Sequence, residues 1–253
     1  MKYRTIRRLI YLKKAHHRRG HGIHSPFLFR LITTVIENRQ ALPEYKVLRN
    51  LKVKAVNLLS EFSDQSLSTI YLQFNLPHSN PRKLYQKVEM PYRYGTVVFR
   101  LIREFNPASV INFGPTTGAN LALMSMENTN RIVYQVINNP IYESLSKKLL
   151  NDLTLTNIQF LDEKSVPSIN PEFIMINCAD NPDHSRRLVQ KKLMMAGDND
   201  VLIIRGIHET KEMESIWHEM IASESVRISL DLFEIGITLF HKRLQKENFV
   251  FKY

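Results

Sequence analysis

The chain has 253 residues, a length that suits one domain or one domain with a substantial extension. Its hydrophobic fraction of 43% and charged fraction of 23% argue against wholesale disorder. The single cysteine, Cys178, excludes a framework of intrachain disulfides and suits a reducing compartment. With no secretory signal and no apolar run long enough to cross a membrane, the sequence predicts a cytoplasmic protein.

The net charge of +11 is concentrated at the N-terminus. Eight of the first twenty residues are lysine or arginine and no acidic residue precedes Glu37, so the remaining chain carries only +3. Such a segment can attract nucleic acid, acidic lipid or another anionic ligand. Residues 1–20 match no known nucleic-acid-binding motif, so we expect no specific nucleic-acid recognition and rank an anionic surface above it as a partner.

Residues 1–108 are predicted to be mostly helical. Apolar residues at helical spacing among the cations, namely Tyr3, Ile6, Leu9 and Ile10, predict a first helix that packs on the body by its apolar side. The pair Ser25–Pro26 is typical of a helix start, because the hydroxyl can cap a free amide and proline fits the first turn. Further helices are expected over 44–61 and 92–105. Prolines make residues 75–91 a loop with some helical character.

From residue 109 onward, short apolar runs alternate with helical segments. Strands are predicted at 110–113, 132–137, 157–161, 173–177 and 201–204, with helices at about 118–128, 140–153, 183–196 and 209–223. This alternation implies an α/β fold with a parallel, Rossmann-like sheet covered on both faces. The closely spaced β-rich stretches after residue 225 predict an antiparallel end. We therefore expect a helical extension over 1–108 and a Rossmann-like domain over 109–253.

The stretch "SVINFGPTTGAN", residues 109–120, joins the first predicted strand to a helix through two glycines, Gly114 and Gly118. A ligand's polar groups can lie against the amides at such a helix start, and glycine permits close approach of the backbone. The same pattern also suits a tight strand-to-helix turn that binds nothing. Two glycines alone do not separate the two interpretations.

Several segments resemble the class I S-adenosylmethionine-dependent methyltransferases. "FGPTTGAN" is similar to the first motif of that family in its O-methyltransferase-like members. The resemblance is closer to a Bacteroidetes-type O-methyltransferase-like group. It is carried by "HGIHSPFLF", "YGTVVFRLIREFNP", "IHETKEMESIWHEM" and "SLDLFEIGITLFHKRLQKENFVFK", which together span most of the chain.

The resemblance implies S-adenosylmethionine as the cofactor, with the donor over the glycine loop and the adenosine near two asparagines. The implied cofactor-binding residues are Gly114, Pro115, Thr116, Thr117, Gly118, Asn138 and Asn177. The implied activity is methyl transfer to a small-molecule acceptor, whose identity the sequence does not give. The alternative is a catalytically dead relative that keeps the fold and binds a partner or an anion.

Acidic residues typical of the family are replaced at several places. Asn112 precedes the glycine loop, Asn138 follows the second strand, and Asn177 stands where relatives have an aspartate. After the fifth strand, Arg205 and Gly206 stand where relatives have two acids. Divalent ions prefer carboxylate oxygens and arginine repels them, so we expect no catalytic metal. An asparagine can still accept a hydrogen bond from a ribose hydroxyl, without the strength of a charge-assisted bond.

Two histidines are candidate catalytic residues. His208 follows the fifth strand, where a general base can reach a substrate, although it also suits packing against the next helix. His24, by resemblance, is a candidate for closing over the ligand crevice. His16, His17 and His21 nearby favour a solvated basic turn over a metal site, since no carboxylate or cysteine lies near them in the sequence.

The remaining candidates have structural interpretations of equal or greater weight. Asp180 and Asp183 follow the fourth strand, where they can reach the crevice or form a turn and a helix cap. Trp217 lies at helical spacing from Met213 and Met220, which predicts core packing.

Overall fold

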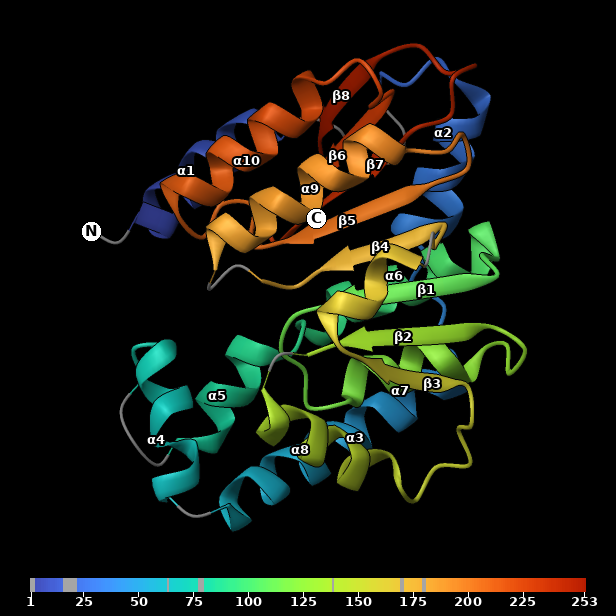
Figure 1. Cartoon of the computed structure of the whole chain (residues 1–253). Coiled ribbons are helices and arrows are strands. Elements are labelled where there is room, and N and C mark those ends of the chain that lie inside the picture. The colour runs from blue at the N-terminus through green and yellow to red at the C-terminus, as the bar shows by residue number, and fades with distance from the viewer. Residues whose placement is uncertain are drawn as a thin grey trace. The chain divides into compact units, whose positions relative to one another are not determined.

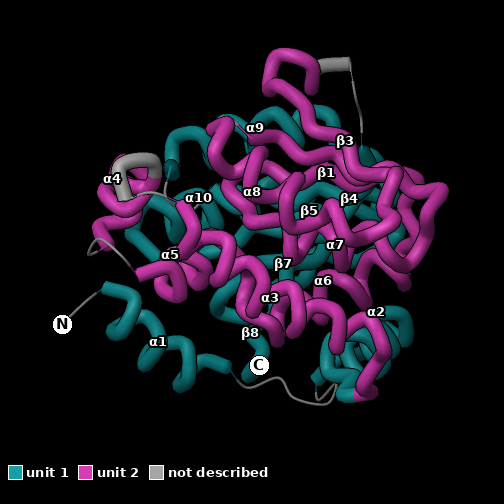
Figure 2. The backbone as a smooth tube through the Cα atoms, turned by 90° about the horizontal axis from the view of Figure 1, so that it is seen from below, with its two compact units in different colours: residues 1–39, 171–253 teal, residues 40–170 magenta. Residues whose placement is uncertain are grey.

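The computed structural model describes residues 3–15, 22–62, 64–76, 80–137, 139–168, 171–178 and 181–253. The chain forms two compact units, one of residues 1–39 and 171–253 and the other of residues 40–170 (Figure 2). The expected boundary between residues 108 and 109 falls inside the second of these units, and as a division into domains it stays a prediction. Within the described ranges, no helix is both long and apolar enough to span a bilayer.

The strands are mostly parallel and follow the order β3-β2-β1 in the unit of residues 40–170 and β4-β5-β7-β6-β8 in the other unit. β2 pairs in parallel with β1 and β3, and β5 pairs in parallel with β4. β7 runs antiparallel to both β5 and β6, whereas β8 returns parallel to β6. The predicted α/β, Rossmann-like sheet with an antiparallel C-terminal segment is therefore confirmed.

The unit of residues 40–170 contains three strands and the helices beside them (Figure 1). Its elements are α3 Pro43–Glu61, α4 Asp64–Gln73, α5 Pro81–Val88, α6 Tyr92–Phe105, β1 Ser109–Phe113, α7 Ala119–Met126, β2 Ile132–Val136, α8 Pro140–Leu150, β3 Ile158–Leu161 and the 3₁₀ helix Glu163–Ser168. α4 was not expected, and α5 occupies the segment predicted as a loop with helical character.

Helix α3 organises the core of this unit. Its buried residues Tyr45, Leu48, Leu51, Ala55 and Leu59 recur every three or four positions, which places them on one helical face. They belong to one apolar cluster with side chains of α5, α7 and α8. This cluster holds the helices that begin beside the carboxyl ends of β1 and β2.

The unit of residues 1–39 and 171–253 contains the other five strands. Its elements are α1 Tyr3–Lys14, α2 Pro26–Arg30, the π-helix Leu31–Ile36, β4 Phe173–Ile176, α9 Pro182–Met195, β5 Val201–Arg205, α10 Lys211–Ala222, β6 Ile228–Asp231, β7 Ile235–Leu239 and β8 Glu247–Val250. Helices α9 and α10 lie side by side along these strands (Figure 1).

Two local expectations in this unit are confirmed. The Ser25 hydroxyl accepts a hydrogen bond from the Leu28 amide at 3.4 Å and caps α2, with Pro26 in its first turn. Trp217 is a core residue, only 3% exposed. Its ring lies so close to β7 that a Cβ on Gly236 would come within 2.3 Å of it, so the strand needs glycine there.

The orientation of α1 differs from the sequence prediction. Two of the four apolar residues expected to face the body are exposed, Ile6 at 41% and Leu9 at 53%. The side that packs on the unit carries Tyr11 and Ala15 together with arginines that pair with carboxylates. The predicted packing was therefore right for Tyr3, which contacts Glu214, and wrong for Ile6 and Leu9, because the ion pairs of the arginines fix the rotation of the helix.

Candidate functional site

The predicted glycine loop connects β1 to α7 as a strand-to-helix turn. Gly114 follows the strand with φ +104°, and Gly118 precedes the helix with φ +100°. Both angles lie in the region that side chains with a Cβ rarely adopt. A Cβ on Gly118 would also approach the backbone of Ser146 in α8 to 3.1 Å. The second glycine therefore permits the close packing of α8 as well as the turn.

A buried carboxylate from outside the loop binds its polar groups. Glu89, only 1% exposed, lies directly after α5. Its Oε1 accepts hydrogen bonds from Thr116 Oγ1 at 2.7 Å, Thr117 N at 2.5 Å and Thr117 Oγ1 at 2.7 Å. Its Oε2 accepts from Asn120 N at 3.3 Å and from the Asn120 side-chain amide. One acid thus satisfies five donors of the loop and of the first turn of α7.

The position of Glu89 has an electrostatic reason. Free amides and the helix dipole make the start of α7 favourable for a negative charge. Glu89 supplies that charge from within the chain. Burial, and after it the charge of Glu89, raises the pKa of the neighbouring Tyr85 phenol. The anion-binding capacity expected of the loop is consequently used by an internal carboxylate, which orders Thr116 and Thr117.

Asn112, which replaces the acid before the loop, has a partner on the neighbouring strand. It lies opposite Gln135 in the β1–β2 register, and its Nδ2 donates to Gln135 Oε1 at 2.6 Å. Gln135 Nε2 donates in turn to the carbonyls of Gly114 at 2.9 Å and Val136 at 3.0 Å. An aspartate at 112 could not donate this bond when ionised. The asparagine is therefore part of a neutral pair that fixes the first residue of the loop.

A cavity of about 460 Å³ lies at the carboxyl ends of β2 and β3. It is lined by Gln135, Ile137, Asn139, Pro140, Glu143, Phe160, Leu161 and Asp162. This volume falls within the usual range of small-molecule sites, and its lining combines apolar surface with hydrogen-bonding groups. Asn138, the predicted adenosine contact, lies outside the described residues, but Ile137 and Asn139 on either side of it both line the cavity.

Asn177 and Arg205, at the positions where the family resemblance places acids, contact each other. Arg205 Nη1 donates to Asn177 Oδ1 at 3.0 Å, and Arg205 Nε lies 3.5 Å from Glu234 Oε1. All three side chains are buried, and Glu234 also pairs with Arg4 of α1. A guanidinium occupies the place where the resemblance puts metal-binding carboxylates. Among the described residues, no group of histidine, cysteine and acidic side chains is arranged to hold a metal ion.

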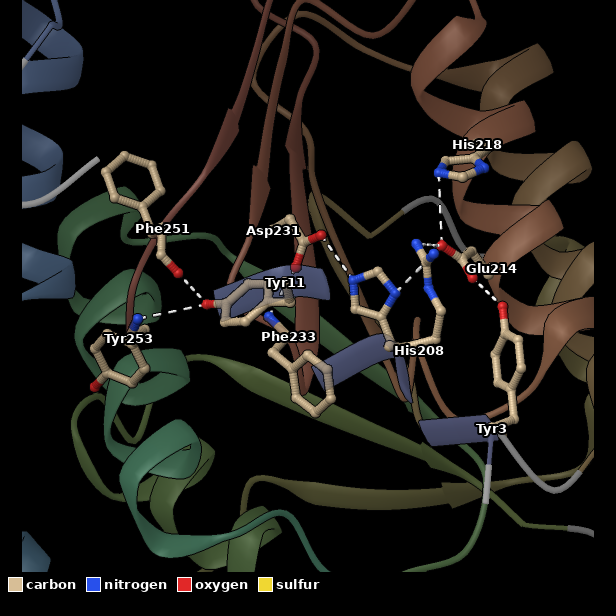
Figure 3. Close-up of polar contacts among 10 residues, drawn as sticks. Tyr3, Tyr11, His208, Glu214, His218, Asp231, Phe233, Phe251 and Tyr253 are labelled. Atoms are coloured by element: carbon tan, nitrogen blue, oxygen red, sulfur yellow. Dashed lines mark hydrogen bonds and ion pairs between the residues drawn. The ribbon is translucent and has the colours of Figure 1, made fainter. Parts of the chain in front are cut away.

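His208 is buried beneath α1 (Figure 3). Its Nε2 lies 2.7 Å from Asp231 Oδ2, and its ring stacks on Phe233 with centroids 5.3 Å apart. Its Nδ1 is 3.7 Å from Glu214 Oε1, beyond hydrogen-bond distance. Tyr11 of α1 covers the ring, with centroids 6.3 Å apart. These contacts are those of a packed core histidine, and a catalytic role for His208 stays a prediction.

The other candidates are dispersed. His24 is exposed, immediately before the cap residue of α2. Asp183 is exposed in the first turn of α9, where Asn181 provides the cap by accepting from the His184 amide at 3.1 Å. His16, His17, His21 and Asp180 lie outside the described residues.

Sequence reasoning missed Glu89 and Gln135, which hold the loop. A usable signal existed for Glu89, since a single acid flanked by Val88 and Met90 is expected to be buried with partners. For Gln135, the signal was an amide in an otherwise apolar strand. Gln135 could not be matched to Asn112 without the register of β1 and β2, and Glu89 could not be matched to the loop without the packing of α5 beside α7.

Searches with the sequence find no match among family models and none among curated proteins. The structure, however, is similar to solved methyltransferases. An SAH-bound methyltransferase of Podospora anserina, PaMTH1, aligns with a TM-score of 0.58 and 9% identity over 86% of this chain and 97% of its own. The fold is that of class I methyltransferases.

Two further structures with this fold agree. The O-methyltransferase TomG of Streptomyces achromogenes, solved in complex with SAM, has a TM-score of 0.52 and 12% identity over 79% of this chain and 99% of its own. A putative caffeoyl-CoA O-methyltransferase of Staphylococcus aureus has a TM-score of 0.53 and 12% identity over 78% and 98%. At these identities the methyltransferase fold is what the similarity establishes.

Proposed function

We propose that this protein binds S-adenosylmethionine at the cavity of residues 40–170 and transfers its methyl group to a small-molecule acceptor without a metal. The observation that carries the proposal is the cavity itself. It lies where β2 and β3 end, in a fold shared with SAM- and SAH-bound proteins, and ligands of parallel α/β sheets bind at such carboxyl ends.

The lining suits a nucleoside. Ile137, Phe160 and Leu161 offer apolar surface for a purine ring. Asn139 and Asp162 offer oxygen acceptors for hydroxyl or amino groups. Methyl transfer from a sulfonium requires alignment of the acceptor with the methyl group, so a metal is not needed for the chemistry. We also propose, on the sequence resemblance, that the protein belongs to the Bacteroidetes-type O-methyltransferase-like group.

Calorimetric titration with S-adenosylmethionine and with S-adenosylhomocysteine tests the binding. We expect both to bind at one site per chain, because they share the nucleoside. No binding heat from either nucleoside, with the chain folded by circular dichroism, would refute the proposal. Formation of S-adenosylhomocysteine in the presence of a small-molecule extract then tests transfer.

A second candidate is favoured by one observation. Asn177, Arg205 and His208, which the resemblance places near the chemistry, are all buried in internal polar contacts. We infer from this the alternative of a relative that binds the nucleoside but has lost methyl transfer. It predicts normal binding of both nucleosides and no S-adenosylhomocysteine formation with any acceptor, whereas formation with one acceptor excludes it.

The cations near the N-terminus supply a property separate from the cofactor site. α1 carries basic residues and no acid along its length, which favours attraction to an anionic surface. This part of the proposal concerns long-range charge only and does not depend on methyl transfer.

A further inference from the structure

The outward face of α1 carries three exposed apolar side chains. Ile6 is 41% exposed, Leu9 53% and Leu12 45%. Their spacing of three residues places them along one side of the helix. Single exposed apolar residues are ordinary on protein surfaces, but a row of them on one helix is typical of a binding face.

The opposite face of α1 explains why this row points outward. Arg7 and Tyr3 both contact the buried Glu214, and Arg4 lies 2.5 Å from Glu209 Oε2. The Tyr11 hydroxyl donates to the Phe251 carbonyl (Figure 3). Rotating the helix to bury Ile6 and Leu9 would leave Glu214 without these partners, and an unpaired buried carboxylate is costly. The apolar row is therefore held outward by ion pairs on the inner side.

The charges around the row identify its partner. Arg8, Lys13 and Lys14 are exposed on the same helix. A second copy of this face would bring the same cations together, which opposes self-association. A nucleic acid would satisfy the cations but would leave the leucines without an apolar partner. A bilayer with anionic headgroups satisfies both, because apolar side chains enter the boundary with the acyl chains while cations remain among the phosphates.

We propose that α1 docks this protein on anionic membranes. Ile6, Leu9 and Leu12 insert at the boundary between headgroups and acyl chains, and Lys13 and Lys14 bind the headgroup phosphates. Arg8, whose guanidinium lies 6.0 Å from the centroid of the Phe233 ring, adds its charge from the side of the helix. The helix lies in the plane of the surface, since its inner face stays paired with Glu214 and Glu209. This inference does not rest on the cofactor proposal, because none of these residues lines the cavity.

Co-sedimentation of the full chain with vesicles tests the proposal. We expect binding to vesicles of phosphatidylcholine with phosphatidylserine, and much weaker binding to phosphatidylcholine alone, with the difference shrinking as salt rises. In the variant Leu9→Gln/Leu12→Gln, binding to the anionic vesicles should fall by about tenfold or more, from the apolar area no longer buried. Charge reversal in Lys13→Glu/Lys14→Glu should also weaken it.

The matched control is Met194→Gln/Met195→Gln, which removes two apolar side chains that are 80% and 49% exposed on α9. This variant should bind vesicles as the unaltered chain does. All of the altered residues are exposed, and unfolding curves verify that each variant is folded. Equal binding by the α1 leucine variant and the unaltered chain would overturn the proposal.

Three other results would also overturn it. One is equal binding to neutral and anionic vesicles. Another is a dimer in sedimentation velocity that Leu9→Gln/Leu12→Gln dissociates, since the row would then be covered by a second copy. The last is binding of RNA but of no vesicle, which would mean that the cations act without the apolar row.

Discussion

The two units differ at the carboxyl ends of their parallel strands. Where β2 and β3 end, in residues 40–170, a cavity of about 460 Å³ lies among Asn139, Glu143 and Asp162. After β4 and β5, in the other unit, the corresponding polar side chains pair with one another through Asn177, Arg205 and Glu234. Among the described residues, the first region thus has room for a ligand, whereas in the second Asn177, Arg205 and Glu234 are occupied by contacts with one another.

Both regions contain a buried acidic residue even though the expected motif positions carry none. Asn112 pairs with Gln135, while the loop beside it receives a carboxylate from Glu89. Arg205 stands where the resemblance expects an acid, and its carboxylate partner is Glu234, immediately before β7. Glu89 and Glu234 supply the negative charge of the two regions, so the residues at the motif positions alone do not describe their electrostatics.

The largest expected effect is that of Glu89→Ala, which removes the carboxylate that binds the glycine loop. It leaves five buried donors without their acceptor, and we expect a loss of about 3 kcal/mol in the free energy of unfolding. Urea unfolding measures the loss. Glu61→Ala, which removes an exposed acid at the end of α3, should change stability by less than about 0.5 kcal/mol. Equal effects of the two variants would show that Glu89 does not hold the loop.

The second region is tested by Arg205→Met. Removing the guanidinium leaves Asn177 without this donor and leaves Glu234 with its ion pair to Arg4, so we expect a loss of about 2 kcal/mol in the free energy of unfolding. The control Arg186→Met removes a surface pair with Glu219 and should cost less than about 1 kcal/mol. A more stable Arg205→Met variant would mean that the buried charge is retained for a function rather than for the fold.

Asn139→Asp tests whether the ribose of the ligand binds in the cavity beside residue 139. The Asn139 side chain caps α8 by accepting from the Ile141 amide at 2.9 Å, and aspartate preserves this cap. The added charge strengthens hydrogen bonds from ribose hydroxyls, so we expect affinity for S-adenosylhomocysteine to rise about fivefold by calorimetry.

The control for that variant is Asn80→Asp at the same capping position of α5, where the side chain accepts from the Lys83 amide at 2.9 Å. It makes the same chemical change at a residue that does not line the cavity and should leave the affinity unchanged. A gain in both variants would indicate a general charge effect, and a gain in neither would count against ribose binding at Asn139.

The smallest expected effect concerns His218 beside α1. Partial burial, and after it the positive charge of Arg7, lowers the pKa of His218 below its usual value of 6.5. The neutral imidazole is thus favoured in the folded chain, so the contribution to stability is present above about pH 6.5 and is lost as the pH falls. In Arg7→Gln the pKa of His218 should rise in an NMR titration, whereas Arg103→Gln should leave the pKa of His218 unchanged. No rise would mean that α1 does not lie against α10 through Arg7.

Much of the fold could be predicted because the sequence alternates clearly. The predicted strand at 201–204 and helix at 92–105 match Val201–Arg205 and Tyr92–Phe105 within one residue. The glycine loop was located because Gly114 and Gly118 stand between an apolar strand and a helix. These features depend on local spacing, which is visible in the chain itself.

The rest depended on contacts between distant segments. Glu89 and Thr117 are 28 residues apart, and Arg4 and Glu234 are 230 apart, so no local pattern identifies either pair. The rotation of α1 was predicted wrongly for the same reason. Hydrophobic periodicity predicts which side of a helix is apolar, but buried acids elsewhere in the unit determined which side faces the body.

The central claim is that the cavity at the ends of β2 and β3 holds the nucleoside. The direct test is an amide NMR titration of the full chain with S-adenosylhomocysteine. We expect the largest shifts at Ile137, Asn139, Leu161 and Asp162, with smaller changes at Gly114. Saturable binding without any shift at these residues would contradict it, because the ligand would then occupy another site.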